Sequence, residues 1–279
     1  MEDQLSALFA TIALPALAAG ICGGILAGLL GVGGGIVIVP ALYFALSLTG
    51  MDAGQVMQLS VGTSLATIIF TSLSSSLGHY RRGAIDFDLL KLWGPSILVG
   101  VVIGGVLGGI VSGLALIAVF AVVALVVALD MILRGGGEID SPRSFSKPLW
   151  AVFGVIAGAI SAMMGIGGGT VCVPLLSFLG YEIRRAVGTS AAIGFIIGLP
   201  GAITYVLTGL GQTGLPPLSF GYVNLAAAAI IIPLTVVFAR VGVAIAHRIP
   251  RRALRLTFGL FLLITSARMG LDLYAALRA

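Results

Sequence analysis

Charged residues are rare in this chain, and long apolar stretches lie between them. Five windows contain no Lys, Arg, Asp or Glu: residues 4–51, 53–80, 92–129, 148–181 and 186–239. A helix needs roughly 20 apolar residues to cross a hydrocarbon core of about 30 Å, so each window can hold at least one crossing. The pattern predicts an all-α polytopic membrane protein.

Glycines and polar residues divide the chain into ten apolar pieces, five in each half. The pieces cover approximately residues 8–30, 36–48, 56–78, 89–110, 114–133, 149–164, 169–180, 186–208, 221–246 and 253–276. The second piece of each half has roughly 12 or 13 residues, which reach about 20 Å as a helix and cannot cross the core upright. We therefore expect each half to contain a hairpin of helices broken at glycines, followed by three transmembrane helices. The total is then about 8 to 10 helices.

The second half of the sequence repeats the first. Residues 31–35 (Gly-Val-Gly-Gly-Gly), with Val39 and Pro40 after them, return as residues 165–169 (Gly-Ile-Gly-Gly-Gly) with another Val-Pro pair. Three further matches are residues 61–64 with 187–190, residues 83–86 with 221–224, and Pro95 with Pro233. Residues 1–133 are therefore predicted to form a first repeat and residues 148–279 a second. Between them lies a polar linker, residues 134–147, which is rich in glycine and typical of a boundary between units.

Basic residues gather on different loops in the two halves. The loop after the third piece is basic in the first half, with Arg81 and Arg82, and has no Lys or Arg in the second half, at residues 209–220. The loop before the third piece shows the reverse bias, with Arg184 and Arg185 in the second half. Because positively charged loops stay in the cytoplasm, the halves are predicted to be inserted in opposite orientations. Both termini are then expected outside the cytoplasm and the linker inside it.

Composition restricts the class of protein further. Hydrophobic residues make up 59% of the chain and charged residues 9%, and the mean hydropathy is +1.17. A water-soluble fold would lack enough polar surface. The net charge of +5 resides in short loops, so it indicates orientation rather than a nucleic-acid partner. The start at Glu2 and Asp3 lacks the basic region of a cleavable signal, and we expect this segment to be retained.

Groups suited to catalysis or metal binding are scarce at membrane depth. His79 and His247 lie beside basic loops, where we expect them at the membrane interface. No His, Cys or carboxylate cluster has the spacing of a metal site, and no Ser/His/Asp set or carboxylate pair suggests catalysis. The sequence therefore predicts no metal, no cofactor and no enzyme activity. A membrane-embedded enzyme or an assembly scaffold is the least favoured alternative.

The glycine runs and nearby hydroxyls are the candidate substrate site. An inverted repeat brings two broken hairpins to the membrane midplane, where helices starting at about Ile36 and Thr170 present free N–H groups and positive dipole ends to a small anion. Glycines let a ligand approach the backbone, and Thr-Ser pairs in the next helices add donors. The predicted substrate-binding residues are Gly33, Gly34, Gly35, Ile36, Thr63, Ser64, Gly167, Gly168, Gly169, Thr170, Thr189 and Ser190.

Each of these features also has a structural interpretation. Glycines in membrane helices let backbones pack closely, and hydroxyls bond their own helix or a neighbouring one. Arg268, in the last apolar piece, is either an interfacial residue or part of an anion path. The glycine-rich face around Gly100, Gly104 and Gly108 can pack within one chain or between two, so a homodimer is left open.

Taken together, the motifs resemble the sulfite exporter TauE/SafE family of membrane permeases. The resemblance rests on residues 28–35 and their copy at 163–169, on the Val-Pro pairs that follow, on Val-Gly-Thr-Ser in both halves, and on residues 79–83. It covers nearly the whole chain. The resemblance implies transport of small sulfur-containing oxyanions, such as sulfite or the organosulfonate sulfoacetate, across a bacterial-type inner membrane.

The leading hypothesis from the sequence is a secondary transporter that works by alternating access around the midplane site. The alternative is a passive anion channel with the same architecture, and no sequence feature separates the two. The identity of the anion, the direction of transport, the coupling ion and the oligomeric state stay open at this point.

Overall fold

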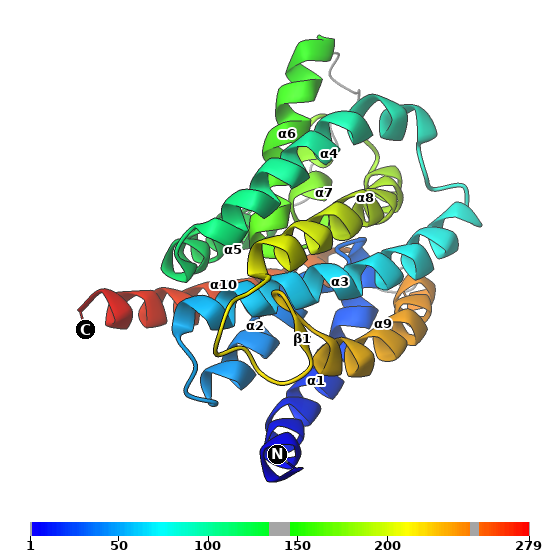
Figure 1. Cartoon of the computed structure of the whole chain (residues 1–279). Helices are drawn as coiled ribbons and strands as arrows, with labels where there is room; N and C mark the ends of the chain where they lie inside the picture. Colours follow the sequence, from blue (N-terminus) through cyan, green and yellow to red (C-terminus); the bar gives the residue numbers. More distant parts are fainter. Residues whose placement is uncertain (1, 134–145, 246–250, 279) are drawn as a thin grey trace.

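The computed structural model describes residues 2–133, 146–245 and 251–278, which are almost entirely helical (Figure 1). The elements in chain order are α1 (Glu2–Leu30), α2 (Gly35–Ser47), α3 (Ala53–Tyr80), α4 (Phe87–Ile110), α5 (Gly113–Leu133), α6 (Lys147–Met164), α7 (Gly169–Phe178), α8 (Ile183–Gly209), β1 (Ser219–Phe220), β2 (Val223–Asn224), α9 (Leu225–Ile245) and α10 (Arg251–Arg278). Most of the predicted linker, and His247, lie outside the described residues.

The predicted fold class is confirmed. Each of the ten predicted apolar pieces corresponds to a helix, and among the described residues seven helices are long and apolar enough to cross a membrane. Helix is the expected outcome for such pieces, because a backbone in lipid has no water to bond and must satisfy its own N–H and C=O groups. The chain is therefore an all-α polytopic membrane protein.

The first helix of each half differs from its counterpart in length. α1 has 29 residues and is long enough to cross a bilayer alone, whereas α6 has 18 and falls among the shorter helices. The helices that follow are short, as predicted, with 13 residues in α2 and 10 in α7. The two hairpins are therefore less alike than the sequence repeat suggests.

One predicted helix start is wrong. The piece expected from residue 221 begins only at Leu225, because the residues before it form a small antiparallel hairpin of β1 and β2. Gly221 has φ +54° in the tight turn, a conformation that favours glycine. Asn224 then caps α9, since its side-chain oxygen accepts a hydrogen bond of 2.9 Å from Ala227 N.

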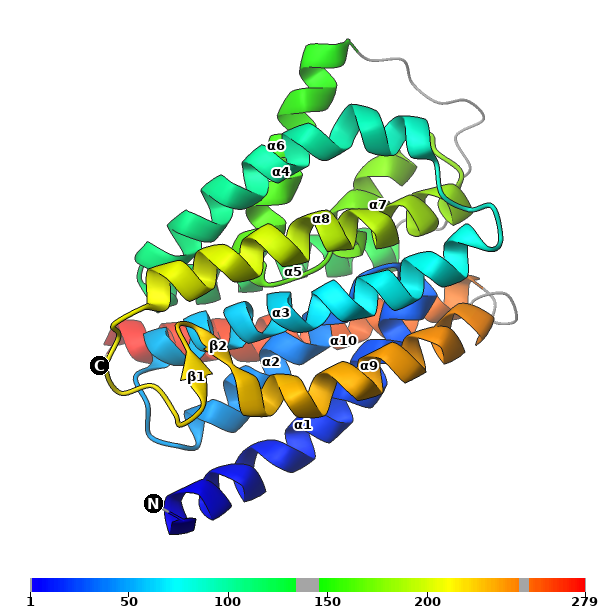
Figure 2. The same ribbon diagram turned by 45° about the vertical axis from the view of Figure 1, so that its right-hand side comes forward.

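The helices of the two halves exchange packing partners. α1 packs along α9, and its counterpart in the repeat, α6, packs along α4. The central pair α3 and α8 pack on each other, as do α5 and α10 (Figure 2). Exchanged contacts of this kind are expected for two halves related by a two-fold axis, so they support the predicted repeat without fixing its orientation in a membrane.

Single glycines make this exchange possible. A Cβ on Gly104 of α4 would collide with the carbonyl oxygen of Ala159 in α6, and a Cβ on Gly242 of α9 would collide with that of Ile25 in α1. The helix backbones therefore touch at both crossings, as in small-residue packing of membrane helices.

The glycine-rich face of α4 packs inside the protomer. Added Cβ atoms on Gly100 and Gly104 would collide with the backbone of α6, and those on Gly105, Gly108 and Gly109 with side chains of α8. This face is thus already occupied by helices of the same chain. A homodimer stays a prediction, without support from these glycines.

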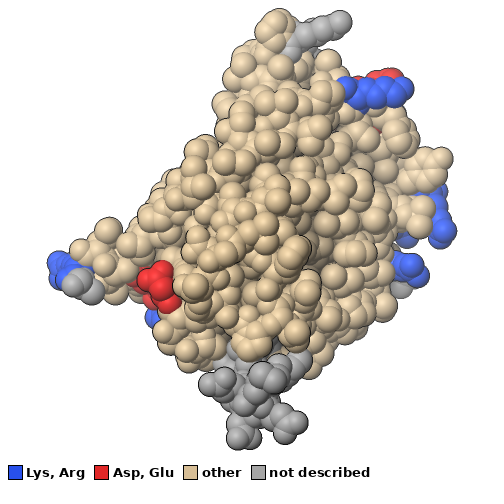
Figure 3. Space-filling model, in the orientation of Figure 1, with Lys and Arg blue, Asp and Glu red and all other residues tan. Residues whose placement is uncertain are grey.

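Charged side chains lie at the two ends of the helix bundle. In Figure 3 the Lys and Arg side chains lie mainly along one margin, with a second group beside the C-terminal end of α10, and the broad face between them carries none. α3 ends and α8 begins at the same end of the bundle, whereas α1 begins and α10 ends at the other (Figure 2). The bare middle is the surface expected to face lipid.

Glycine at position 242 is predicted to be required for stability. Gly242→Ala should lower the thermal unfolding midpoint of detergent-solubilised protein by several degrees, because overpacking against a backbone costs about 1–3 kcal/mol. Gly270→Ala in α10 is the matched control, since a Cβ there meets nothing within 4 Å. Ala is the better helix former, so the control should keep or raise the midpoint. Equal midpoints for the two variants would contradict the packing described.

Candidate functional site

Both glycine runs break the helical path where the sequence predicts. At the first break Gly31, Gly33 and Gly34 have φ of +67°, +71° and +81°, and α2 starts at Gly35. At the second break only Gly165 has a positive φ, +67°, and α7 starts at Gly169. Left-handed backbone is readily adopted by glycine alone, so the first break in particular needs these residues.

The structure brings the two breaks into direct contact. A Cβ built on Gly33 would lie 3.2 Å from Gly167 Cα, and one built on Gly167 would lie 2.6 Å from the carbonyl oxygen of Val32. A Cβ on Gly35 would collide with the carbonyl of Gly165. The space that these glycines leave is therefore filled by the opposite break.

Of the other three predicted glycines, Gly169 also lies against the opposite break, at Gly31, whereas Gly34 and Gly168 face helices. A Cβ on Gly34 would lie 2.8 Å from the carbonyl oxygen of Gly23 in α1, and one on Gly168 would lie 2.9 Å from that of Ser190 in α8. All residues of both breaks are buried, and so is Ile36, with 0% of its surface exposed. The first amides of α2 and α7 therefore open onto the protein interior.

Two of the three predicted threonines, Thr63 and Thr189, hold the loops that enter α9 and α4. Thr63 Oγ1 accepts a hydrogen bond of 2.9 Å from Asn224 N, and Thr189 Oγ1 accepts one of 2.9 Å from Asp86 N. These bonds join matching positions of the repeat and cross from one half to the other. Each threonine thus has a structural role in addition to any part in binding, which stays a prediction.

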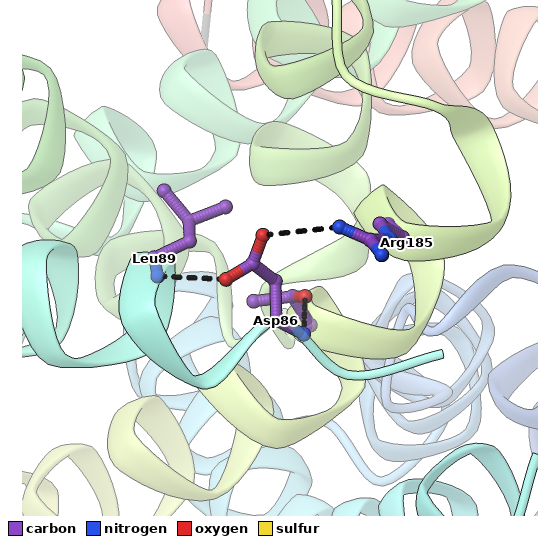
Figure 4. Close-up of polar contacts among 4 residues, drawn as sticks. Asp86, Leu89 and Arg185 are labelled. Carbon is purple, nitrogen blue, oxygen red and sulfur yellow. Dashed lines mark hydrogen bonds and ion pairs between the residues drawn. The ribbon is translucent and has the colours of Figure 1, made fainter. Parts of the chain in front are cut away.

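Asp86 caps a helix beside Thr189, and sequence reasoning noted it only as part of a repeat. Its carboxylate accepts a hydrogen bond of 3.0 Å from Leu89 N, which caps α4, and lies 3.9 Å from a guanidinium nitrogen of Arg185 (Figure 4). Arg185 is 60% exposed, so this ion pair adds little stability. The matching Asn224 performs the same capping role without a charge. The sequence match between residues 83–86 and 221–224 could have indicated this shared capping role.

The two predicted serines differ in their hydrogen bonds. Ser64 Oγ donates to the carbonyl oxygen of Gly165, at 2.7 Å, and so fixes α3 to the second break. Ser190 Oγ is buried and has no hydrogen-bond partner. Thr170 Oγ1, at the start of α7, is also buried and has no partner. The sequence repeat pairs Ser64 with Ser190, yet only the Ser64 hydroxyl forms a hydrogen bond within the protein.

Among the described residues, five buried side-chain atoms have no hydrogen-bond partner. Four of them belong to α3 or to helices of the second half near its break. They are the hydroxyls of Ser72, Ser161, Thr170 and Ser190, and the fifth is that of Tyr205. Sequence reasoning did not select Ser72 or Ser161. One feature of the sequence could have identified Ser72: Ser64, Ile68 and Ser72 are spaced by four residues and so lie on one face of the helix.

The structure defines the contacts of two further residues discussed from the sequence, His79 and Arg268. His79, expected at the interface, is 5% exposed, and its Nε2 lies 3.3 Å from the carbonyl oxygen of Gly28 near the first break. Arg268 is 62% exposed and lies 3.6 Å from Asp272 in its own helix, with its guanidinium 6.0 Å from the ring centroid of Phe44. This arrangement fits the interfacial interpretation of Arg268.

The site contains neutral hydrogen-bond donors and no formal charge. Residues 31–36, 61–72, 165–170 and 187–198 include no Lys, Arg, Asp or Glu. Within the described part of the chain, no three His, Cys, Asp or Glu side chains are grouped to hold a metal ion. An anion here would be stabilised by amide and hydroxyl donors and by the positive end of a helix dipole.

Comparison with known proteins now assigns the family. The sequence profile described as Sulfite exporter TauE/SafE matches residues 16–269. The chain belongs to the sulfite exporter TauE/SafE family. The match spans both halves and includes both glycine breaks, so the breaks lie inside the TauE/SafE region rather than in an added segment.

Relatives of this TauE/SafE protein are named as transporters. A probable membrane transporter protein of Haemophilus influenzae is 31% identical over 259 residues, which cover 93% of this chain and 98% of the relative. A probable membrane transporter protein of Methanocaldococcus jannaschii is 27% identical, covering 86% and 91%. One of Bacillus subtilis, YunE, is 26% identical, covering 68% and 77%. No solved structure shows a significant match.

Thr189 is predicted to be needed for stability even without an anion. Thr189→Val should lower the unfolding midpoint of ligand-free protein by a few degrees, because the half-buried Asp86 N–H loses its acceptor at a cost of about 1 kcal/mol. Thr189→Ser keeps the hydroxyl and should stay close to the wild type. A valine variant as stable as the serine variant would show that the loop does not depend on this bond.

Proposed function

We propose that this chain is a secondary transporter of small sulfur-containing oxyanions, such as sulfite or organosulfonates, and that it works by alternating access around the crossing of its two glycine breaks. The observation that carries the proposal is that two helix N-termini start from breaks in direct contact at the centre of the molecule. Broken helices whose amide ends meet a central site are typical of secondary transporters.

Membership of the TauE/SafE family and the names of the relatives support membrane transport. The choice of anion rests on the family description together with the donor set, which offers N–H and O–H groups to the oxygens of a small anion. A site without a buried cation suits a small anion with few charges, since neutral donors and a partial dipole compensate only part of a full charge.

The contacts between the halves suggest how access can alternate. α1 and α6 each pack on a helix of the opposite half, and the central α3–α8 contact passes beside both breaks. Rocking of one half against the other would shift the breaks relative to the outer helices without unfolding either. The buried position of both breaks is what an occluded intermediate of such a cycle requires.

We also propose that the protein lies in a cell inner membrane with its basic loops in the cytoplasm and both termini outside. The basis is the loop bias of Arg81, Arg82, Arg184 and Arg185, which lie at one end of the bundle, away from the start of α1 and the end of α10.

A side chain at the second break is predicted to stop transport. Gly168→Val places a branched side chain against Ile193 and the Ser190 carbonyl, and we expect uptake of labelled sulfite or sulfoacetate into proteoliposomes to fall at least about tenfold. Gly270→Val, where a Cβ meets nothing within 4 Å, is the control and should transport like the wild type. Equal flux in both variants would exclude the second break from the pathway.

The same proteoliposomes separate a carrier from the channel alternative. A carrier should show saturable uptake that is accelerated by unlabelled anion on the opposite side, because each reorientation of the loaded site moves one substrate. Unitary current steps in a planar bilayer, with flux that does not saturate, would instead establish a channel.

The topology is tested by fusions of alkaline phosphatase and green fluorescent protein. A phosphatase fused after residue 279 should be active and a fluorescent protein at the same place dark, since the C-terminus is predicted outside the cytoplasm. The opposite pattern is expected for fusions truncated within the linker, near residue 140. A fluorescent C-terminal fusion would reverse the proposed orientation.

A further inference from the structure

We propose that the anion is bound asymmetrically, at the second glycine break alone, by the hydroxyls of Ser72, Thr170 and Ser190 beside the start of α7. This inference rests on the proposed function. It departs from a symmetrical cradle of both breaks, which the sequence repeat alone would favour.

The first break is closed by a side chain. Ile68 of α3 lies against it, with Cγ2 3.1 Å from a Cβ position on Gly33 and Cδ1 2.9 Å from one on Gly35. Ser64 Oγ is also committed, since it donates to the carbonyl of Gly165. Of the two α3 side chains beside the first break, Ile68 has no hydroxyl and the hydroxyl of Ser64 is already bonded, so neither offers an anion a free donor.

The second break has glycine where the first has isoleucine. The Val-Gly-Thr-Ser match aligns Ile68 of α3 with Gly194 of α8. A Cβ on Gly194 would collide with Ser72 Oγ and would lie 4.0 Å from Gly168 N. The hydroxyl of Ser72 therefore occupies the place of the missing side chain and points toward the second break.

Three unpartnered hydroxyls belong to residues at or beside the second break. Ser72, Thr170 and Ser190 are 1%, 2% and 0% exposed, and none of their hydroxyls has a hydrogen-bond partner. They come from α3, α7 and α8, and the Ser190 carbonyl lies 2.9 Å from a Cβ position on Gly168. A buried hydroxyl without a partner is unfavourable, so three near one helix start indicate a ligand that supplies acceptors.

The donor chemistry selects an anion with several oxygens. Three hydroxyls can each donate one hydrogen bond, and the first amides of α7 add N–H donors and the positive end of the helix dipole. A terminal SO₃ group offers three acceptor oxygens that match such a set. Hydrogen bonds to a charged acceptor are also the stronger kind.

The test uses Ser72→Ala, Thr170→Val and Ser190→Ala in the full chain, purified in detergent, with radiolabelled sulfite and sulfoacetate as probes. Each variant should raise the equilibrium Kd by about tenfold or more and reduce proteoliposome uptake in proportion, since each removes a bond to a charged acceptor. The ligand-free unfolding midpoint should not fall, because the deleted hydroxyl has no partner to lose.

Ser60→Ala and Ser75→Ala are matched controls in α3. Both hydroxyls are buried, and they donate to the carbonyl oxygens of Val56 at 2.7 Å and Ala27 at 3.2 Å. These variants should keep the wild-type Kd. Wild-type affinity in all three site variants, with binding intact, would overturn the asymmetric site and leave the proposed function standing. A wild-type protein that neither binds nor transports these anions would overturn the proposed function and this inference together.

Discussion

The arrangement of the whole molecule depends on one contact, in which the backbones of the two glycine breaks touch at its centre. Gly33 and Gly167 lie against each other, and Gly35 and Gly169 lie against the carbonyls of the opposite break. A side chain at these positions would force the breaks apart, and with them the short helices α2 and α7. Backbone that leaves a helix at membrane depth needs protein around it, and here each break supplies that surrounding for the other.

The central contact is connected to the outer helices by paired hydrogen bonds. Thr63 on α3 and Thr189 on α8 are next in sequence to Ser64 and Ser190, which contact the second break, and they accept from the loops that enter α9 and α4. In the proposed cycle, a movement of α3 against α8 would be transmitted to the loops before α9 and α4, and so to α1 and α6, which pack on these two helices. The structure links the breaks to the periphery through bonds that join matching positions of the repeat.

Apolar periodicity and helix length predicted the fold, because in lipid they leave few alternatives to helices of set length. The sequence also located both breaks within a residue of their observed helix starts. It missed the hairpin before α9, since strands of two residues have no periodicity to detect. It could not distinguish Ser64 from Ser190 or select Ser72, because these differences arise only when α3 and α8 are packed and the partner of each hydroxyl is fixed.

A site of neutral donors has a consequence for the transport cycle. A fixed cation would be left uncompensated in lipid whenever the anion departs, and a buried unpaired charge costs far more than a buried unpaired hydroxyl. Each unpartnered hydroxyl costs about 1–3 kcal/mol, which the anion recovers on binding. In the proposed asymmetric site, three such groups would favour the loaded state over the empty one and would still leave the empty state accessible. A carrier that must return without its substrate requires that balance, and in the proposed asymmetric site it would arise from the differences between the two halves of the duplicated sequence.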